Sequence, residues 1–185
     1  YYEQNLSHTL LNRYYCLYEA PESNMYGPGM WGLTACYGAG TSPSYEARNP
    51  LKDDGVIAPT AALSSMPYTP FYSVQVLMEL DKIDAVKGRY GFADSYKPSE
   101  NAADRRHLSI DQGPIVVMIE NYRSGLVWNL LMKNKHAQRG LELAGIRKPA
   151  LKEGFVGVPL DTRTRYSDLL QHPDRKVYEV DFFLD

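Results

Sequence analysis

The 185-residue sequence predicts a mainly α fold. Apolar residues recur at helical spacing over residues 3–18, 70–84 and 114–134. Proline opens the second and third of these stretches, where its fixed φ and missing N–H suit the first helical position. Strand-like patterns gather after Gly145. We therefore expect helices separated by loops, followed by a short β tail.

The first expected helix runs from about Glu3 to Tyr18, with leucines and tyrosines along one side. A glycine-rich loop of about forty residues follows it, which is well above the usual length of a connection. Loops of that length are usually either functional or disordered. This segment is therefore a place to look for ligand contacts.

The middle of the chain predicts two further helices. A short helical piece is expected at residues 60–65, and a longer helix is expected to be capped by Thr69, to begin at Pro70 and to end near Asp84. The glycines and aromatic residues of segment 88–96 predict a short extended turn.

The last third begins with a central helix, expected from Pro114 to Asn134, and a shorter helix at residues 135–143. Beyond these helices, residues 156–158 and 176–183 alternate or cluster like strands. We expect residues 147–185 to form an appended extended or β tail.

Composition excludes several classes of function. A formal net charge of −2 and the lack of a basic run argue against a nucleic-acid partner. The sequence has no apolar stretch long enough to span a bilayer. Two cysteines and four histidines lack the spacing of metal ligands, so neither a metal nor an organic cofactor is expected. Because the chain starts at Tyr1 without a methionine, we expect a processed chain or part of a larger one.

Tyrosine is the most conspicuous feature of the composition, with fifteen in the chain. Aromatic planes stack on the C–H faces of sugar rings and phenol hydroxyls bond sugar hydroxyls, so saccharide clefts are often lined this way. Aromatic residues in the Gly/Pro-rich loops are better candidates for ligand contact than those on helices. These loop residues are Tyr26, Trp31, Tyr37, Tyr90 and Tyr96.

Asp111 and Gln112 lie at the expected mouth of the central helix. A carboxylate in that place has two interpretations. It can cap the helix, favoured by the helix dipole, or it can serve as a general acid or base in a cleft. The spacing alone leaves both open.

Four segments together resemble the glucoamylase-like (glycoamylase) family, which is related to the endo-β-1,2-glucanases of glycoside hydrolase family 144. They are Tyr26–Cys36, Asp53–Ala62, Gly88–Asp94 and Ile110–Gly125, in the family's order. The resemblance covers about residues 1–146. It implies an (α/α)6 toroid, of which this chain would be the C-terminal half, with the missing N-terminal half as its partner. The tail after Arg147 is not covered.

The resemblance also implies hydrolysis of a glucosidic bond with inversion, by one carboxylic acid and one carboxylate. In inverting enzymes the two carboxyl groups stand about 6.5–9.5 Å apart, which leaves room for water. Asp111 is the first candidate for a catalytic carboxylate. Asp94 is the second, because the family places an acidic residue after Tyr-Gly-Phe. The proton donor is expected to lie in the absent half.

Other polar and aromatic residues are candidates for substrate binding, each with a structural alternative. Trp31 could stack a glucose ring or anchor its loop inward, and Asp54 could bond sugar hydroxyls or form a turn before Gly55. Glu120 and Arg123 could orient groups in the cleft or form a surface ion pair. The full set of candidates is Trp31, Tyr37, Asp54, Arg89, Tyr90, Gln112, Glu120 and Arg123.

The leading functional hypothesis is a glycoside hydrolase acting on β-1,2-glucan. An α-glucan hydrolase of the same fold and a non-catalytic carbohydrate-binding half-domain are the alternatives. A polymeric glucan substrate implies a periplasmic or secreted enzyme.

Overall fold

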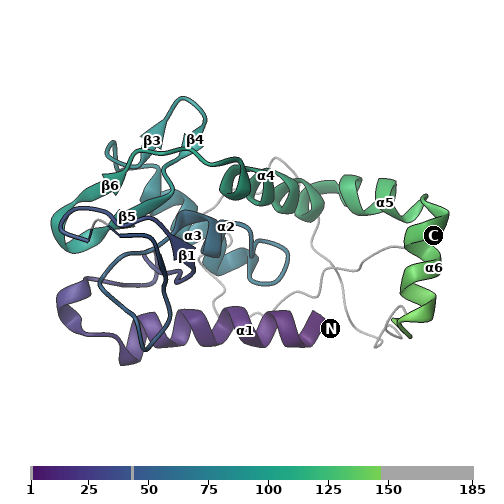
Figure 1. Cartoon of the computed structure of the whole chain (residues 1–185), viewed down its shortest axis with the longest axis horizontal. Helices are drawn as coiled ribbons and strands as arrows, with labels where there is room; N and C mark the ends of the chain where they lie inside the picture. Colours follow the sequence, from purple (N-terminus) through teal and green to yellow (C-terminus); the bar gives the residue numbers. More distant parts are fainter. Residues whose placement is uncertain (1, 43, 147–185) are drawn as a thin grey trace. The chain divides into compact units, whose positions relative to one another are not determined.

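The computed structural model describes residues 2–42 and 44–146, which form parts of two compact units (Figure 1). The first unit extends to Met118 and the second starts at Ile119. About half of the described residues are helical, and the strands are short. The mainly α prediction is therefore confirmed at this level. The predicted strands at 156–158 and 176–183 lie outside the described residues.

Two helical regions of the first unit follow the sequence patterns closely. Helix α1 covers Tyr2–Tyr14 and continues as a π-helical turn over Tyr15–Glu19. Helices α2 (Pro59–Leu63) and α3 (Pro70–Leu80) pack against each other, and each begins with a proline. The predicted cap is wrong, because the Thr69 hydroxyl makes no capping bond to α3.

The strands described in the first unit form three two-stranded antiparallel sheets. Sequence patterns missed most of them, since they are only two or three residues long and leave little room for an alternating pattern. The pairs are β1 (Ala35–Cys36) with β2 (Glu46–Ala47), β3 (Lys87–Gly88) with β4 (Gly91–Phe92), and β5 (Ser95–Lys97) with β6 (Ala102–Asp104). The expected extended turn at 88–96 therefore belongs to two different sheets.

The long loop is ordered around one carboxylate, that of Asp53. Its oxygens accept hydrogen bonds from the hydroxyls of Tyr15 (3.0 Å) and Tyr26 (2.7 Å), from Asn24 Nδ2 (2.9 Å) and from the backbone N–H of Gly55 (3.0 Å). Burial and the bond to Asp53 raise the pKa of Tyr15 to about 12, so the phenol stays protonated and donates. A loop that appears irregular in sequence is thus fixed by polar contacts.

The core of the first unit lies where this loop meets α2 and α3. Val56, Ile57 and Ala58 are fully buried, and so are Leu63 of α2 and Leu80 of α3. The backbones of Ile57 and Tyr96 exchange hydrogen bonds of 2.9 and 2.8 Å, which attach the β5–β6 sheet to this core. These bonds hold the β5–β6 sheet (Figure 1) against the segment that leads into α2.

The predicted central helix is two helices. Helix α4 covers Ser109–Ser124, so Pro114 lies inside it rather than at its first position. The helix then breaks at Gly125, whose φ of +67° is left-handed, and resumes as α5 (Leu126–Met132). Apolar spacing continues across the break, which is why the pattern predicted a single helix.

Polar side chains define the remaining helix ends of the second unit. Asn121, only 2% exposed, accepts the backbone N–H of Trp128 at 3.0 Å and so ties the end of α4 to α5. The Asn134 side chain caps α6 (Lys135–Leu143) by accepting the N–H groups of His136 and Ala137. None of the described helices is both long and apolar enough to cross a membrane.

Replacing Gly125 with alanine should lower the free energy of unfolding by about 1 kcal/mol, because an L-residue is disfavoured in the left-handed conformation. Urea denaturation followed by circular dichroism measures the change. Gly140→Ala is the matched control, since Gly140 lies in α6 and an added Cβ meets nothing within 4 Å. The control should raise stability by about 0.5–1 kcal/mol. Equal stability of Gly125→Ala and the wild type would contradict this role for the glycine.

Candidate active site

Asp94 lies between β4 and β5 and is held at both its backbone and its side chain. Its N–H donates to the carbonyl of Arg106 at 2.9 Å. Its Oδ2 accepts the backbone N–H of Tyr37 at 2.7 Å. The residue is only 2% exposed. A donated N–H favours the ionised form of a carboxylate, so this geometry suits a charged Asp94.

Asp111 lies within the first turn of α4 and is 6% exposed. Its backbone carbonyl accepts a hydrogen bond from the Thr60 hydroxyl at 3.2 Å, which connects α4 to α2. No N–H or O–H group of the described residues donates to its buried Oδ2. Since Asp111 follows the start of α4 and Oδ2 receives no backbone N–H, the geometry does not favour the capping interpretation.

The two acids face each other and interact. Burial, then a hydrogen bond with Asp94 and the repulsion of its charge, raise the pKa of Asp111 to about 6. Two carboxylates cannot hydrogen bond unless one carries a proton. A proton held between them therefore satisfies the otherwise unpartnered Oδ2 of Asp111. The result is a buried acid pair that shares one proton below about pH 6 and releases it as the pH rises further.

Gln112 holds the start of α4 against the strands. Its Nε2 donates to the carbonyl of Phe92 in β4 at 2.7 Å. Gly91, next to Phe92, has a φ of +112°, and a Cβ there would lie 2.2 Å from Gln112 Oε1. Glycine is therefore required for this close approach. Gln112 thus brings the helix that carries Asp111 to the segment that carries Asp94.

Two of the sequence-predicted binding residues have structural roles. Trp31 is 1% exposed, so its ring packs inside the protein and cannot stack on a sugar in this structure. Asp54 accepts Arg48 Nε at 2.7 Å and Nη2 at 3.0 Å. The Arg48 side chain is fully buried and also donates to the carbonyl of Cys36 at 2.6 Å. Both residues hold the long loop.

The other four candidates make contacts with each other in two pairs. Arg89 and Tyr90 are exposed at the turn of the β3–β4 hairpin, with the guanidinium 5.4 Å from the phenol ring. Glu120 and Arg123, in the second unit, form an ion pair of 3.1 Å on α4. The Arg123 side chain is 57% exposed, which favours the surface interpretation of this pair.

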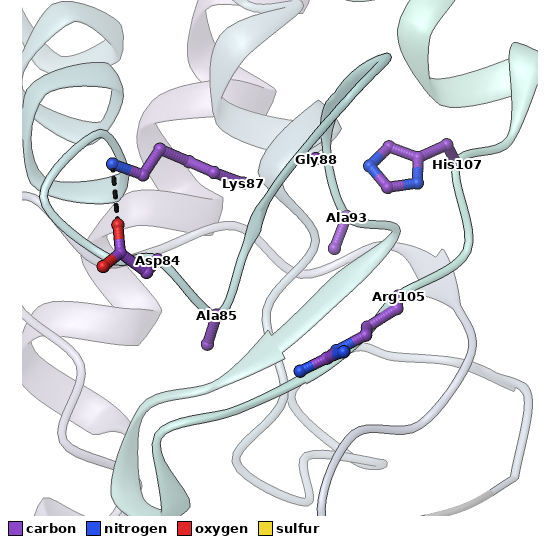
Figure 2. Close-up of a pocket in the computed structure, with 7 residues that line it drawn as sticks. All are labelled: Asp84, Ala85, Lys87, Gly88, Ala93, Arg105 and His107. Carbon is purple, nitrogen blue, oxygen red and sulfur yellow. Dashed lines mark ion pairs between the residues drawn. The ribbon is translucent and has the colours of Figure 1, made fainter.

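A cavity of about 370 Å³ opens near the segment that carries Asp94, as Figure 2 shows. Neither acid lines it, although Ala93 does. One of the cations that line it, Lys87, is paired with Asp84 at 3.0 Å. The lining residues are Asp84, Ala85, Lys87, Gly88, Ala93, Arg105 and His107. Within the described part of the chain, no group of three or more His, Cys, Asp or Glu side chains could hold a metal ion.

Sequence reasoning missed the residues around Tyr37. The guanidinium of Arg106 lies 3.6 Å from the centre of the Tyr37 ring. Tyr45 meets the same ring edge-on, with centroids 5.2 Å apart. These contacts join β1, β2 and the segment after β6. A single sequence carries no local signal for a cation and two rings that are so far apart along the chain.

Replacing Asp54 with alanine should lower the free energy of unfolding by about 2 kcal/mol, because Arg48 would stay buried without its partner. Asp54 is partly exposed, so the loss should be smaller than for a fully buried pair. Chemical denaturation measures this loss. Glu79→Ala is the control, since it removes an exposed pair with Lys82 and should change stability by less than about 0.5 kcal/mol. Equal losses in the two variants would contradict the structural role of Asp54.

The acid pair makes stability depend on pH. An aspartate in the unfolded chain titrates near pH 3.9, whereas Asp111 titrates near 6 when folded. The folded state therefore binds this proton more tightly, and the stability it contributes is complete below about pH 4 and is lost as pH rises through about 6. Relative to Asp111→Asn, the wild type should lose about 2 kcal/mol between pH 4 and pH 7. Urea denaturation across this range tests it, and parallel pH profiles for the two proteins would contradict it.

Known proteins are similar to this chain in sequence. The model of the Glycoamylase family, described as "Putative glucoamylase", matches residues 1–135. The exo β-1,2-glucooligosaccharide sophorohydrolase (non-reducing end) of Parabacteroides distasonis is 36% identical over 146 residues, which are 77% of this chain and 20% of that enzyme.

Solved structures agree with the sequence match. The endo-β-1,2-glucanase from Chitinophaga pinensis, in a sophorotriose and glucose complex, is 48% identical with a TM-score of 0.69, over 76% of this chain and 34% of that one. The β-1,2-glucanase from Parabacteroides distasonis is 36% identical with a TM-score of 0.70, over 77% and 20% of the two chains. The chain thus spans about a fifth to a third of these relatives. On the match to residues 1–135, it belongs to the Glycoamylase family.

Proposed function

We propose that this chain forms part of a glycoside hydrolase that cleaves β-1,2-glucan. The buried acid pair of Asp94 and Asp111 is the observation that carries the proposal, because a carboxyl group with a pKa near 6 can exchange protons at neutral pH. Two relatives named for β-1,2-glucanase activity and one named as a sophorohydrolase support the substrate class.

In the proposed reaction, the pair acts as a general base. The Asp111 carboxylate accepts a proton from a water molecule as the water oxygen attacks the anomeric carbon, and the leaving glucosyl oxygen takes a proton from an acid on the other side. The configuration at that carbon inverts. Asp94 stays ionised and raises the basicity of Asp111 by its charge.

The acid must come from a residue outside the pair. Carboxyl groups that share a hydrogen bond are much closer than the roughly 6.5–9.5 Å of an inverting acid and base. Asp94 and Asp111 therefore serve one side of the scissile bond together. The proton donor would come from the N-terminal half of an (α/α)6 toroid, the fold that the family resemblance implies.

Exposed apolar side chains on the second unit fit such an arrangement. Leu126, Leu130 and Leu131 of α5 are each about half exposed, and Leu143 of α6 is 71% exposed. Helix faces of this kind need to be covered by other helices. We propose that the rest of the toroid covers them, and that the enzyme is periplasmic or secreted, where polymeric glucan is available.

The test is to incubate the whole protein that contains this chain with linear β-1,2-glucan and with soluble starch, and to follow oligosaccharide release by chromatography. Products should form from β-1,2-glucan alone. Asp111→Asn should reduce turnover by at least about a hundredfold, the range over which a general base contributes, while glucan binding persists. Glu120→Gln is the matched control on the same helix and should keep full activity.

Other outcomes distinguish the alternatives. Release from starch alone would favour an α-glucan hydrolase. Binding of β-1,2-glucan without turnover by the wild type would favour a carbohydrate-binding half-domain, and equal turnover by the wild type and Asp111→Asn would exclude Asp111 as the base.

A further inference from the structure

Asp94, Tyr37 and Arg106 form a closed ring of contacts. The backbone N–H of Tyr37 donates to Asp94 Oδ2 at 2.7 Å, and the N–H of Asp94 donates to the carbonyl of Arg106 at 2.9 Å. The Arg106 guanidinium then returns to Tyr37 and lies 3.6 Å from the centre of its ring. Each of the three residues thus contacts the other two.

Arg106 is itself fixed. Asp104 accepts its backbone N–H at 3.0 Å through Oδ1 and its Nη2 at 3.1 Å through Oδ2. In the β5–β6 sheet, Asp104 pairs with Ser95, which is the residue that follows Asp94. The guanidinium therefore lies over the Tyr37 ring because the sheet that follows Asp94 places it there. An exposed arginine without such anchors would spread over many rotamers.

We propose that Arg106 and Tyr37 are positioning residues that hold the Asp94 carboxylate in place through the backbone N–H of Tyr37. The cation–π contact keeps the Tyr37 segment close, and the backbone of that segment supplies the hydrogen bond. Neither side chain touches the reacting atoms. The contribution of this ring of contacts to catalysis rests on the proposed function, whereas its effect on Asp94 does not.

The ring of contacts affects which of the two acids holds the shared proton. Because the Tyr37 N–H donates to Asp94, the proton that the pair holds below about pH 6 stays on Asp111. Asp94 has Asp111 on α4 and Cys36 of β1 as titratable neighbours. Arg106 is the cation of the ring. Burial first, and then the charge of Asp94, raise the pKa of the Cys36 thiol to about 12, so this thiol stays neutral. Loosening the ring should therefore move the proton from Asp111 toward Asp94.

Nuclear magnetic resonance of the chain labelled at the aspartate carboxyl carbons tests this directly. In Arg106→Ala, the titration of Asp111 should move to lower pH than in the wild type. The Tyr37 amide should exchange with solvent about two- to fivefold faster, as expected for the loss of one exposed cation–π contact. Arg106→Lys, which keeps the cation, should restore much of both effects.

Matched variants separate this role from a general loss of structure. Arg105→Ala removes the neighbouring arginine, and Tyr37→Phe keeps the ring, so both should titrate like the wild type. If Arg106→Ala leaves the carboxyl titrations and Tyr37 amide exchange unchanged, or if Arg105→Ala shifts them equally, the proposal is wrong.

Activity gives an independent readout. If the whole protein hydrolyses β-1,2-glucan, Arg106→Ala should lower kcat while KM is maintained, because positioning of a base acts on the chemical step. A loss confined to KM would contradict positioning. If the whole protein is inactive but the titration shifts as described, the positioning role stands and the proposed function fails.

Discussion

The burial of two carboxyl groups against each other is the constraint on which the rest of the site depends. Such a pair is most stable when a proton lies between its members and when donors are aimed at the charged one. The chain supplies these requirements from distant segments: Tyr37 donates to Asp94, Thr60 bonds the backbone of Asp111, and Gln112 holds α4 to β4. The site is therefore a product of the tertiary fold, and no single segment contains it.

The long loop between α1 and α2 makes that arrangement possible. Its backbone has few regular partners, and its order depends on carboxylates that accept several donors each. Burial alone would raise the pKa of Asp54, but the hydrogen bonds and charge of Arg48 outweigh it and hold the pKa below its usual value. Asp53 also holds the loop, because it accepts hydrogen bonds from Tyr15, just after α1, and from Tyr26 within the loop. Tyr37, which lies between these anchors, is fixed well enough to donate to Asp94.

Local signals predicted most of the helices. The features that were not predicted, such as the contact between Arg106 and Tyr37, depend on residues that are far apart in the sequence. Pro70 marks the start of α3 because its preference acts on its own backbone, and the segment 135–143 matches α6. The break at Gly125 was missed since apolar spacing continues on both sides of it. For the site, the family motifs indicated Asp94 and Asp111, but Arg106 could not be found because its contact with Tyr37 depends on the β5–β6 sheet.

The abundance of tyrosine has a structural cause. Tyr15 and Tyr26 donate to the Asp53 carboxylate, and Tyr96 donates to Asn101 at 2.9 Å. Phenylalanine could fill the same space but would remove these hydrogen bonds, which costs stability where the acceptor is partly buried. A count of tyrosines thus overstates the aromatic surface available to a sugar. Tyr37 and Tyr45 differ from these residues because their rings lie in contact with each other, next to the segment that holds Asp94.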